Sequence, residues 1–424
     1  MLFARLIPIE AIGVKYTQLT KNDKAMIKRI SKIVIKALGV VVATAALAIV
    51  ATSISPIYNF GEPQPFSGPN IFNPYRDLDT TYCWKRANLH THTRVEGPLN
   101  ECEKWPREVY DEYQKYGYDI VTFSNHNEIT KHPVSKELQV NLYEHGYNLL
   151  KFHKLVFGSN AVMRFDHLIP AFAFQRQWQL DLLGKESDII VLNHPLRTPL
   201  TTQAMLEKLE GYHIVELDSG KSTENEYWDW ALSAGHYSFG VANDDLHHPE
   251  RTEAIAVRSN FMCCPSATYA DIKESLLGGC YYSMRIPDYG EGDVEVKIAK
   301  NRDLPRITNI GVKGDTIYMS LSHEAAEIKV IGQNHTLLQS TKHTSEVHYV
   351  LGKDEPYARF IIYFEDGAAI YTNPFARYDS SLADTPFHEP THSVNIALTI
   401  LYNLLLAFIA GGLLYAIYRI IKRK

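Results

Sequence analysis

The sequence lacks a strong excess of charge of either sign and has few cysteines. Its 424 residues include 43 lysines and arginines against 48 acidic residues, giving a formal net charge of −5. So small a charge gives no reason to expect nucleic-acid binding through a basic surface. The five cysteines contain no CxxC pair, so a zinc site built from cysteine ligands is not expected. Charged residues make up 21% and hydrophobic residues 45% of the chain, a balance typical of globular proteins.

Two of the cysteines, Cys83 and Cys102, lie on either side of a histidine motif described below. A disulfide between them is permitted if this part of the chain lies outside the cytoplasm. The sequence leaves the alternative, in which all five cysteines are free thiols, equally open.

Two long segments contain no charged residue, residues 37–60 and residues 393–418. A bilayer core of about 30 Å is crossed by a helix of about 20 apolar residues. We therefore expect membrane-spanning helices over residues 37–57 and 393–418. A helix buried in the protein core is the alternative for both segments. A cleaved signal peptide is a further alternative for the first, although the leader of residues 1–36 is long for one.

Basic residues flank both segments on their outer sides. Positive charge is retained in the cytoplasm, so residues 1–36 and 419–424 are expected to be a cytoplasmic leader and tail. The chain between the spans would then lie outside the cytoplasm, on the periplasmic side, and the lipid bilayer would be a partner. The flanking residues are Lys21, Lys24, Lys28, Arg29, Lys32 and Lys36 before the first segment, and Arg419, Lys422, Arg423 and Lys424 after the second.

Three regions differ in pattern between the two apolar segments. Residues 58–82 are rich in proline, glycine and asparagine, which is typical of a linker. Residues 83–287 alternate short apolar runs with helical patterns, which predicts an α/β domain with a parallel sheet or barrel. Residues 290–380 carry β-rich runs, beginning with the alternating VEVKIA at 294–299, and predict a small antiparallel β-sandwich.

Polar residues able to bind metal follow the apolar runs of residues 83–287. In a parallel barrel the carboxyl ends of the strands share one face, and that face carries the catalytic groups. The side chains are therefore expected to meet. They are His90, His92, His126, His194, Glu216, Asp218, Asp245 and His247.

The spacing of the first pair indicates metal binding directly. Residues two apart on a strand point to the same side, so His90 and His92 can hold one cation together. Asp245 and His247 have the same spacing. A lone pair of this kind is more often structural, but four such motifs in one domain favour a metal cluster.

These motifs together resemble a known family. Leu89-His90-Thr91-His92-Thr93, Ser124-Asn125-His126-Asn127, Asn193-His194-Pro195 and Asn243-Asp244-Asp245-Leu246-His247 resemble, in this order, the motifs of the PHP (polymerase and histidinol phosphatase) superfamily. The resemblance covers roughly residues 85–283 and is nearest to the carbaryl-hydrolase-like branch, in which a barrel precedes a β-sandwich. It implies a distorted (β/α)7 barrel, two or three Zn, Mn or Fe ions, and hydrolysis of phosphoesters or related esters.

The resemblance also implies the ligands, with three departures from the family pattern. An acidic residue shortly after the first motif is represented by Glu96, one residue closer than usual. The acid before the second histidine is replaced by Asn125. A bridging glutamate and a later histidine are best matched by Glu144 and His153. The remaining implied ligands are His90, His92, His126, His194, Asp245 and His247.

Further roles are assigned to residues near these motifs. The metal ions would lower the pKa of a bound water and stabilise charge in the transition state. Arg197 is a candidate clamp for a substrate phosphate, and His248 is a candidate proton donor to the leaving group. Glu216 is expected to orient a ligand histidine. The alternatives are that Arg197 is a solvated surface residue and that His248 takes no part in the reaction.

Three functions remain open from the sequence. The first is a phosphoesterase acting on a small-molecule phosphoester. The second is a carboxyl or carbamate ester hydrolase, for which residues 171–174 with Trp178 would supply an apolar pocket. The third is a non-catalytic metal-binding surface module. Oligomeric state cannot be read from the sequence.

Overall fold

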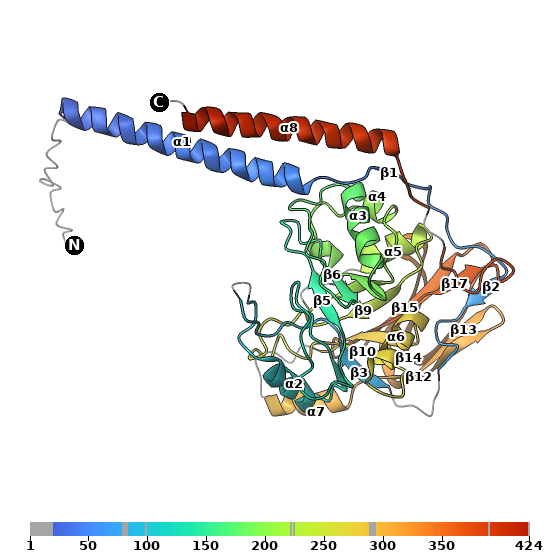
Figure 1. The fold of residues 1–424 in the computed structure, drawn as a ribbon. Coiled ribbons are helices and arrows are strands. Elements are labelled where there is room, and N and C mark those ends of the chain that lie inside the picture. The colour runs from blue at the N-terminus through green and yellow to red at the C-terminus, as the bar shows by residue number, and fades with distance from the viewer. Residues whose placement is uncertain are drawn as a thin grey trace, which may run out of the picture. The chain divides into compact units, whose positions relative to one another are not determined.

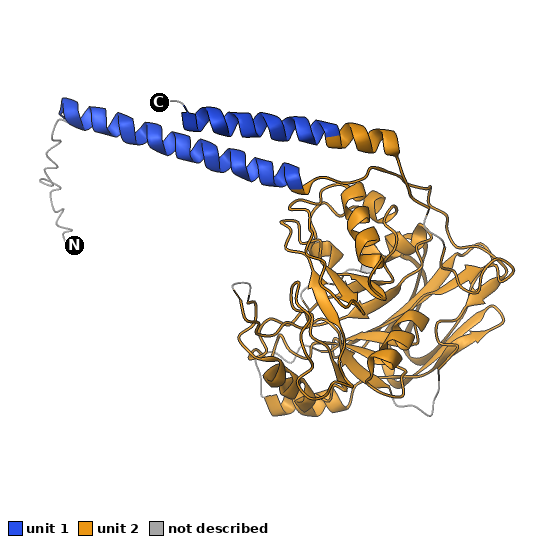
Figure 2. Cartoon of the chain, viewed as in Figure 1, with its two compact units in different colours: residues 1–51, 404–424 blue, residues 52–403 orange. Residues whose placement is uncertain are grey.

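The computed structural model describes residues 20–78, 84–97, 100–220, 223, 225–287, 294–388 and 391–422. The chain forms two compact units (Figure 2), one of residues 1–51 and 404–424 and the other of residues 52–403. The described cysteines, Cys102, Cys263, Cys264 and Cys280, form no disulfide with one another. Cys83, the candidate partner of Cys102, lies outside the described residues.

Two helices carry the apolar segments, α1 (Lys21–Thr52) and α8 (Ile396–Lys422), drawn in blue and red in Figure 1. Both are long and apolar enough to cross a membrane, by length and composition. The first begins well before the expected residue 37, so the basic residues from Lys21 to Lys36 lie on the helix itself. Thr20 caps its start, because the Thr20 hydroxyl accepts a hydrogen bond from the Asp23 amide at 3.2 Å.

A five-stranded sheet lies at the centre of the larger unit. Its order is β5-β6-β7-β8-β9, and all of its residues are buried. The pairs β5–β6 and β6–β7 are antiparallel, whereas β7–β8 and β8–β9 are parallel. The strands are β5 (Leu142–His145), β6 (Lys154–Phe157), β7 (Ile189–Leu192), β8 (Ile214–Asp218) and β9 (Phe239–Ala242).

The helices of this unit follow the predicted pattern, with shifted ends. The sequence has helical patterns at residues 103–116, 170–183, 202–209, 224–234 and 266–277. The observed helices are α2 (Pro106–Lys115), α3 (Ala173–Gly184), α4 (Gln203–Leu206), α5 (Asn225–Ser233) and α6 (Tyr269–Gly278).

A larger sheet contains strands from both of the regions that the sequence pattern separates, residues 83–287 and residues 290–380. Its main order is β12-β13-β15-β16-β11-β10-β3-β4, with β14 on β13 and β17 between β15 and β2. Strands from before and after residue 290 therefore share one sheet, because β11 pairs with β16. The strands are β2 (Asn70–Phe72), β3 (Lys85–Asn88), β4 (Ile120–Val121), β10 (Arg258–Met262), β11 (Tyr281–Arg285), β12 (Ile307–Lys313), β13 (Thr316–Gly332), β14 (Thr336–Val350), β15 (Tyr357–Tyr363), β16 (Ala369–Thr372) and β17 (Phe375–Tyr378).

Two isolated parallel bridges connect the sheets at both edges of the five-stranded one. Thr91, just after β3, bridges Leu246, just after β9. His126, a few residues after β4, bridges Glu144 in β5. The segments that follow β3, β4 and β9 are thereby brought together at one end of the strands.

The run at residues 294–299 was expected to be a strand but forms helix α7 (Val294–Arg302). Its apolar residues alternate, yet the buried positions are Lys297 and Asn301, four residues apart. Lys297 donates hydrogen bonds to backbone carbonyls of the segment 252–255, and Asn301 accepts one from Arg86 at 2.7 Å. These two polar anchors lie on one face of a helix, so tertiary contacts override the alternating pattern.

The chain enters and leaves the larger unit at one place. Strand β1 (Tyr58–Asn59) pairs with β18 (Ser393–Val394). His392 beside this pair lies between two carboxylates, with Nδ1 3.0 Å from Glu210 Oε2 and Nε2 3.1 Å from Asp181 Oδ1. These hydrogen bonds raise the pKa of His392 to about 9.

The His392 contacts make stability depend on pH. The unfolded pKa is about 6.5, so their contribution is complete below that pH and is lost as pH rises through about 9. His392→Gln is expected to lower the melting temperature at pH 6 and to leave it almost unchanged at pH 10, measured by differential scanning fluorimetry. The same substitution at the exposed His343 should show no such difference. An equal loss for His392→Gln at both pH values would contradict the role of the charge.

Candidate metal centre

The candidate site forms where the strand ends of the two sheets meet. His90 and His92 follow β3, His126 follows β4, and Glu144 lies within β5. From the five-stranded sheet, His194 follows β7, Glu216 lies in β8, and Asp245 and His247 follow β9. His194 and Asp245 adopt left-handed backbone conformations, with φ of 30° and 48°, which is uncommon outside glycine. Such strained turns are found at functional sites.

His153 reaches the same place by another route. It precedes strand β6, which runs antiparallel to its neighbours β5 and β7. The start of an antiparallel strand lies beside the ends of the strands next to it. His153 Nδ1 is accordingly 3.1 Å from Glu144 Oε1.

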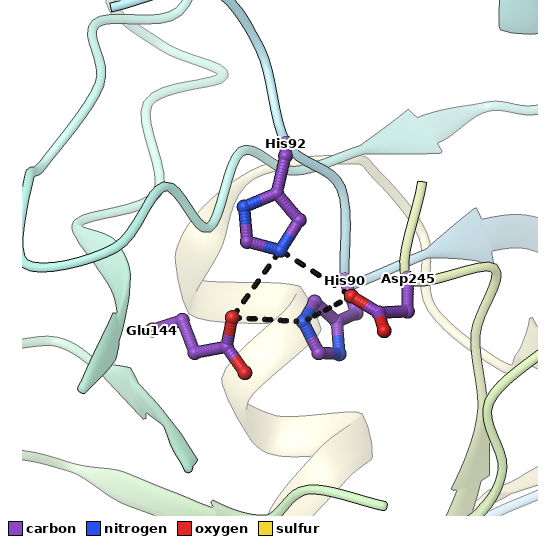
Figure 3. A group of neighbouring side chains, drawn as sticks. All are labelled: His90, His92, Glu144 and Asp245. Carbon is purple, nitrogen blue, oxygen red and sulfur yellow. Dashed lines mark ion pairs between the residues drawn. The ribbon is translucent and has the colours of Figure 1, made fainter. Parts of the chain in front are cut away.

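A first group of four buried side chains is drawn in Figure 3. Glu144 Oε2 lies 3.3 Å from His90 Nε2 and 3.2 Å from His92 Nε2. Asp245 Oδ1 lies 3.1 Å and 3.3 Å from the same two nitrogens. Two imidazoles and two carboxylates thus face one point.

Two further groups share members with the first. His92, Glu101 and His126 form one, in which Glu101 Oε2 is 3.2 Å from His126 Nε2. His126, Glu144 and His153 form the other. His194 Nε2 lies 3.4 Å from Glu144 Oε1. Glu144 therefore contacts five imidazoles, those of His90, His92, His126, His153 and His194.

This donor set fits divalent cations. Imidazole and carboxylate suit zinc, iron and manganese. Despite the short distances, Nε2 of His90 and of His92 is buried and forms no hydrogen bond of good geometry with the described residues. Donor atoms that converge on one point, rather than hydrogen-bonding to each other, are the arrangement that a cation bridges.

Buried carboxylates carry the charge of the cluster. Burial raises the pKa of Glu144, but His126, His90 and His153 lower it well below its usual value. Burial and nearby histidines act on Asp245 in the same way, and its pKa is also lowered well below its usual value. Both groups are thus anions at neutral pH. They hold the pKa of His92 at about 9, although burial alone would lower it, so protons and cations compete for these donors.

Side chains around the cluster form hydrogen bonds that hold His90 and Glu144 in position. Glu216 Oε1 lies 2.9 Å from His90 Nδ1 and accepts from the Asn243 side chain at 3.0 Å. The Asn193 amide donates to Glu144 Oε1 at 2.8 Å. Asn125, the amide that departs from the family pattern, accepts from the Thr93 backbone amide at 2.8 Å. Such contacts fix the rotamers and tautomers of ligating side chains.

The structure gathers most of the residues named from the sequence, with three exceptions, Asp218, Glu96 and His248. Asp218 lies outside the three groups and pairs instead with Arg258. His247 lies at the edge, where its ring stacks on His92 at 4.2 Å between centroids. Arg197 pairs with Asp245 Oδ2 at 2.6 Å. Glu96 is exposed and stands outside the three groups. His248 is also outside them, since its half-exposed ring lies 3.2 Å from Glu250.

Glu101, and not Glu96, lies beside His92 and His126. The loop after His92 folds back, and the Arg94 amide donates to the Lys104 carbonyl at 2.6 Å, which returns Glu101 to the cluster. Its carboxylate lies 3.6 Å from His92 Nδ1 and 3.7 Å from His247 Nε2. No strand precedes Glu101 directly, so the strand-end pattern carried no signal for it.

Substitution of Glu101 and of Glu96 tests directly which of these two carboxylates binds metal. Glu101→Gln is expected to weaken metal binding at least about tenfold, because it removes a charge shared by three imidazoles. Glu96→Gln should leave metal affinity unchanged. Titration of each variant with Mn²⁺, followed by isothermal calorimetry, measures both. A loss of metal affinity in Glu96→Gln alone would show that Glu96, and not Glu101, is the ligand.

Comparison with known proteins gives few likenesses. No protein-family model and no curated protein matches the sequence. The structure of a two-domain protein containing a predicted PHP-like metal-dependent phosphoesterase, from Bacteroides vulgatus ATCC 8482, aligns with 74% of this chain and 99% of its own, at 15% identity and a TM-score of 0.35. A lesion-specific endonuclease from Pyrococcus furiosus aligns with 46% of this chain and 56% of its own, at 13% identity and a TM-score of 0.33. Likenesses this low do not define the chemistry of the site, which rests on the side chains described above.

Proposed function

We propose that this chain is a membrane-anchored, metal-dependent hydrolase of the PHP type, built on a distorted (β/α)7 barrel and acting on phosphoesters. One observation carries the proposal. Glu144 contacts five buried or nearly buried imidazoles from four different strand ends. Such a set of donors is costly to bury unless cations are held there.

The proposed ligands would hold two or three Zn, Mn or Fe ions. Each of Glu144, His92 and His126 belongs to two of the three groups of metal-binding side chains. Shared donors favour cations held close together. When bound, such ions supply a water of low pKa and stabilise negative charge on the substrate.

The residues of the chain itself have separate tasks in this proposal. Glu216 and Asn193 orient His90 and Glu144, so the donors need little rearrangement during turnover. Arg197 is a positioning residue, because its guanidinium is committed to Asp245.

A cavity of about 480 Å³ next to His126 is the proposed substrate pocket. Its walls include Tyr147, Ile129, Val162 and the exposed Arg164. The Tyr147 ring packs against the His126 ring at a tilt of 35°, with 4.8 Å between ring centroids. The same cavity is lined by the carboxylates of Glu96 and Glu128, so Arg164 supplies the one guanidinium in this lining for an anionic substrate.

The carbamate alternative has less support from the structure. Residues 171–174 and Trp178, from which an apolar pocket was expected, are not among the residues that line the cavity next to His126. The Trp178 ring instead packs on Phe165 and His167, at 5.0 and 5.6 Å between centroids. Phe174 stacks on Phe172 and contacts Tyr402.

We further propose that α1 and α8 anchor the catalytic unit to the periplasmic face of a bilayer, with both termini cytoplasmic. The basic residues at the start of α1 and end of α8 support this orientation. The pairing of β1 with β18 supports it too, since it joins the two connections to the helices side by side.

Turnover by the full chain, purified in detergent and loaded with Mn²⁺ or Zn²⁺, tests the function. Nitrophenyl derivatives of a phosphomonoester, a phosphodiester, an acetate and an N-methylcarbamate would be compared. We expect the chain to hydrolyse the phosphoesters. EDTA should abolish this activity, and the His90→Ala variant should show none. Preference for the acetate or carbamate would favour the ester hydrolase, and metal binding without any turnover would favour the non-catalytic module.

A further inference from the structure

Three cysteines, Cys263, Cys264 and Cys280, gather outside the histidine motifs, at the junction of β10, α6 and β11. Strand β10 ends at Met262 and β11 begins at Tyr281, and these two residues pair in antiparallel register. The next rung of this ladder places Cys263 opposite Cys280. The Cys263 amide donates to the Cys280 carbonyl at 3.0 Å, so the pairing continues through both cysteines.

The geometry of this rung suits a disulfide. Directly opposite residues in an antiparallel pair have Cα atoms about 4.5–5.5 Å apart, within the range of about 4.4–6.8 Å that disulfides span. Their side chains also leave the sheet on the same face. A hydrogen bond between the two thiols follows, and it raises the pKa of Cys280 together with burial.

The pair is accessible from one side. Cys263, Cys264 and Cys280 line a cavity of about 520 Å³. Cys263 is half-buried, whereas Cys280 is only 5% exposed. A small molecule in the cavity would therefore meet the Cys263 sulfur first.

We propose that Cys263 and Cys280 are a modification site, at which thiol–disulfide exchange with a small disulfide such as oxidised glutathione forms a structural bond. The Cys263 thiolate attacks one sulfur of the small disulfide and releases the first thiolate. Cys280 then gives up its proton and attacks the Cys263 sulfur, which releases the second. The two protein thiols lose two electrons, and the small disulfide is reduced to two thiols that take up the two protons.

The bond would close the connection that contains α6. This helix is held against the five-stranded sheet at Asp188, which accepts from the Tyr269 hydroxyl at 2.9 Å and pairs with Lys273 at 2.6 Å. A disulfide across a loop of about 15 residues reduces the freedom of the unfolded chain. For a unit of this size we expect the melting temperature to rise by about 5 °C.

Peptide mapping of the full chain in detergent tests the proposal. The protein is incubated with reduced or oxidised glutathione, blocked with N-ethylmaleimide, digested without reduction and analysed by mass spectrometry. We expect a Cys263–Cys280 linked peptide after oxidation only, with the rise in melting temperature reversed by dithiothreitol. Cys264→Ala is the matched control and should keep both effects, whereas Cys263→Ala should lose both. Alkylation of both cysteines after oxidation, or a link from either one to Cys264, would overturn the proposal.

Discussion

Replacing Glu144 with glutamine is expected to lower phosphoester hydrolysis roughly 10³-fold or more and to remove more than one cation per chain. The side chain keeps its size but loses the negative charge that two groups of donors share. Both oxygens are engaged, since Oε2 faces His90, His92 and His126 while Oε1 faces His153 and His194. Steady-state kinetics and metal analysis on the same preparation measure both losses.

Glu137→Gln is the matched control for this variant. Glu137 is exposed and lies in the same part of the chain, so the substitution changes the net charge equally without touching the cluster. We expect it to keep full metal content and activity. A Glu144→Gln variant that retained both would show that the imidazoles do not depend on this carboxylate.

Asp229→Asn is expected to lower the free energy of unfolding by about 3–5 kcal/mol. Asp229 lies in α5 and is fully buried with Arg359 of β15, whose Nε is 2.8 Å from Asp229 Oδ1. The Tyr357 hydroxyl donates to the same oxygen at 3.0 Å, and His335 contacts the other. Loss of the charge would leave the Arg359 guanidinium buried without a counter-ion, which is far more costly than the loss of one hydrogen bond.

The exposed pair Arg107 and Asp111 serves as the comparison. Arg107 Nε lies 3.0 Å from Asp111 Oδ2, close to the 2.8 Å of the buried pair, but both side chains are more than half exposed. Solvent screens such a pair, so Asp111→Asn should cost much less than Asp229→Asn in urea unfolding followed by circular dichroism. Equal losses would mean that burial of the Asp229 pair does not set its contribution.

The sequence indicated most of the candidate site because its residues lie at strand ends. His90, His92, His126, His194 and Asp245 follow apolar runs, and a shared sheet edge brings such positions together. Glu144 and His153 came from the family resemblance rather than from this pattern. That difference has a structural cause, since β6 runs antiparallel and reverses the end at which His153 lies.

Glu101 could not be predicted in the same way. It stands in a loop whose path depends on a backbone hydrogen bond between Arg94 and Lys104, and a loop of this kind has no periodic signal. Glu96 was nearer to the family pattern in sequence but is exposed. Distance along the chain is a poor guide to which carboxylate of a folded-back loop reaches a buried cluster.

The fold was predictable at the level of its elements but not of its sheet connections. Apolar runs at residues 188–193, 213–217 and 237–242 predict β7, β8 and β9, and the β-rich runs after residue 300 predict strands that also form. Long-range pairing of β11 with β16 joins regions that differ in pattern, and local sequence carries no information on it. Helix α7 shows the same limit, because Lys297 is buried through contacts with a segment about 45 residues earlier in the chain.

Metal analysis of the purified full chain tests the central claim most directly. The chain would be exposed to Zn²⁺, Mn²⁺ or Fe²⁺, freed of unbound ions by gel filtration, and analysed by inductively coupled plasma mass spectrometry. We predict two or three tightly held cations per chain, and fewer in the Glu144→Gln variant. A chain that retains less than one cation with every metal, while remaining folded, would contradict the proposed metal centre.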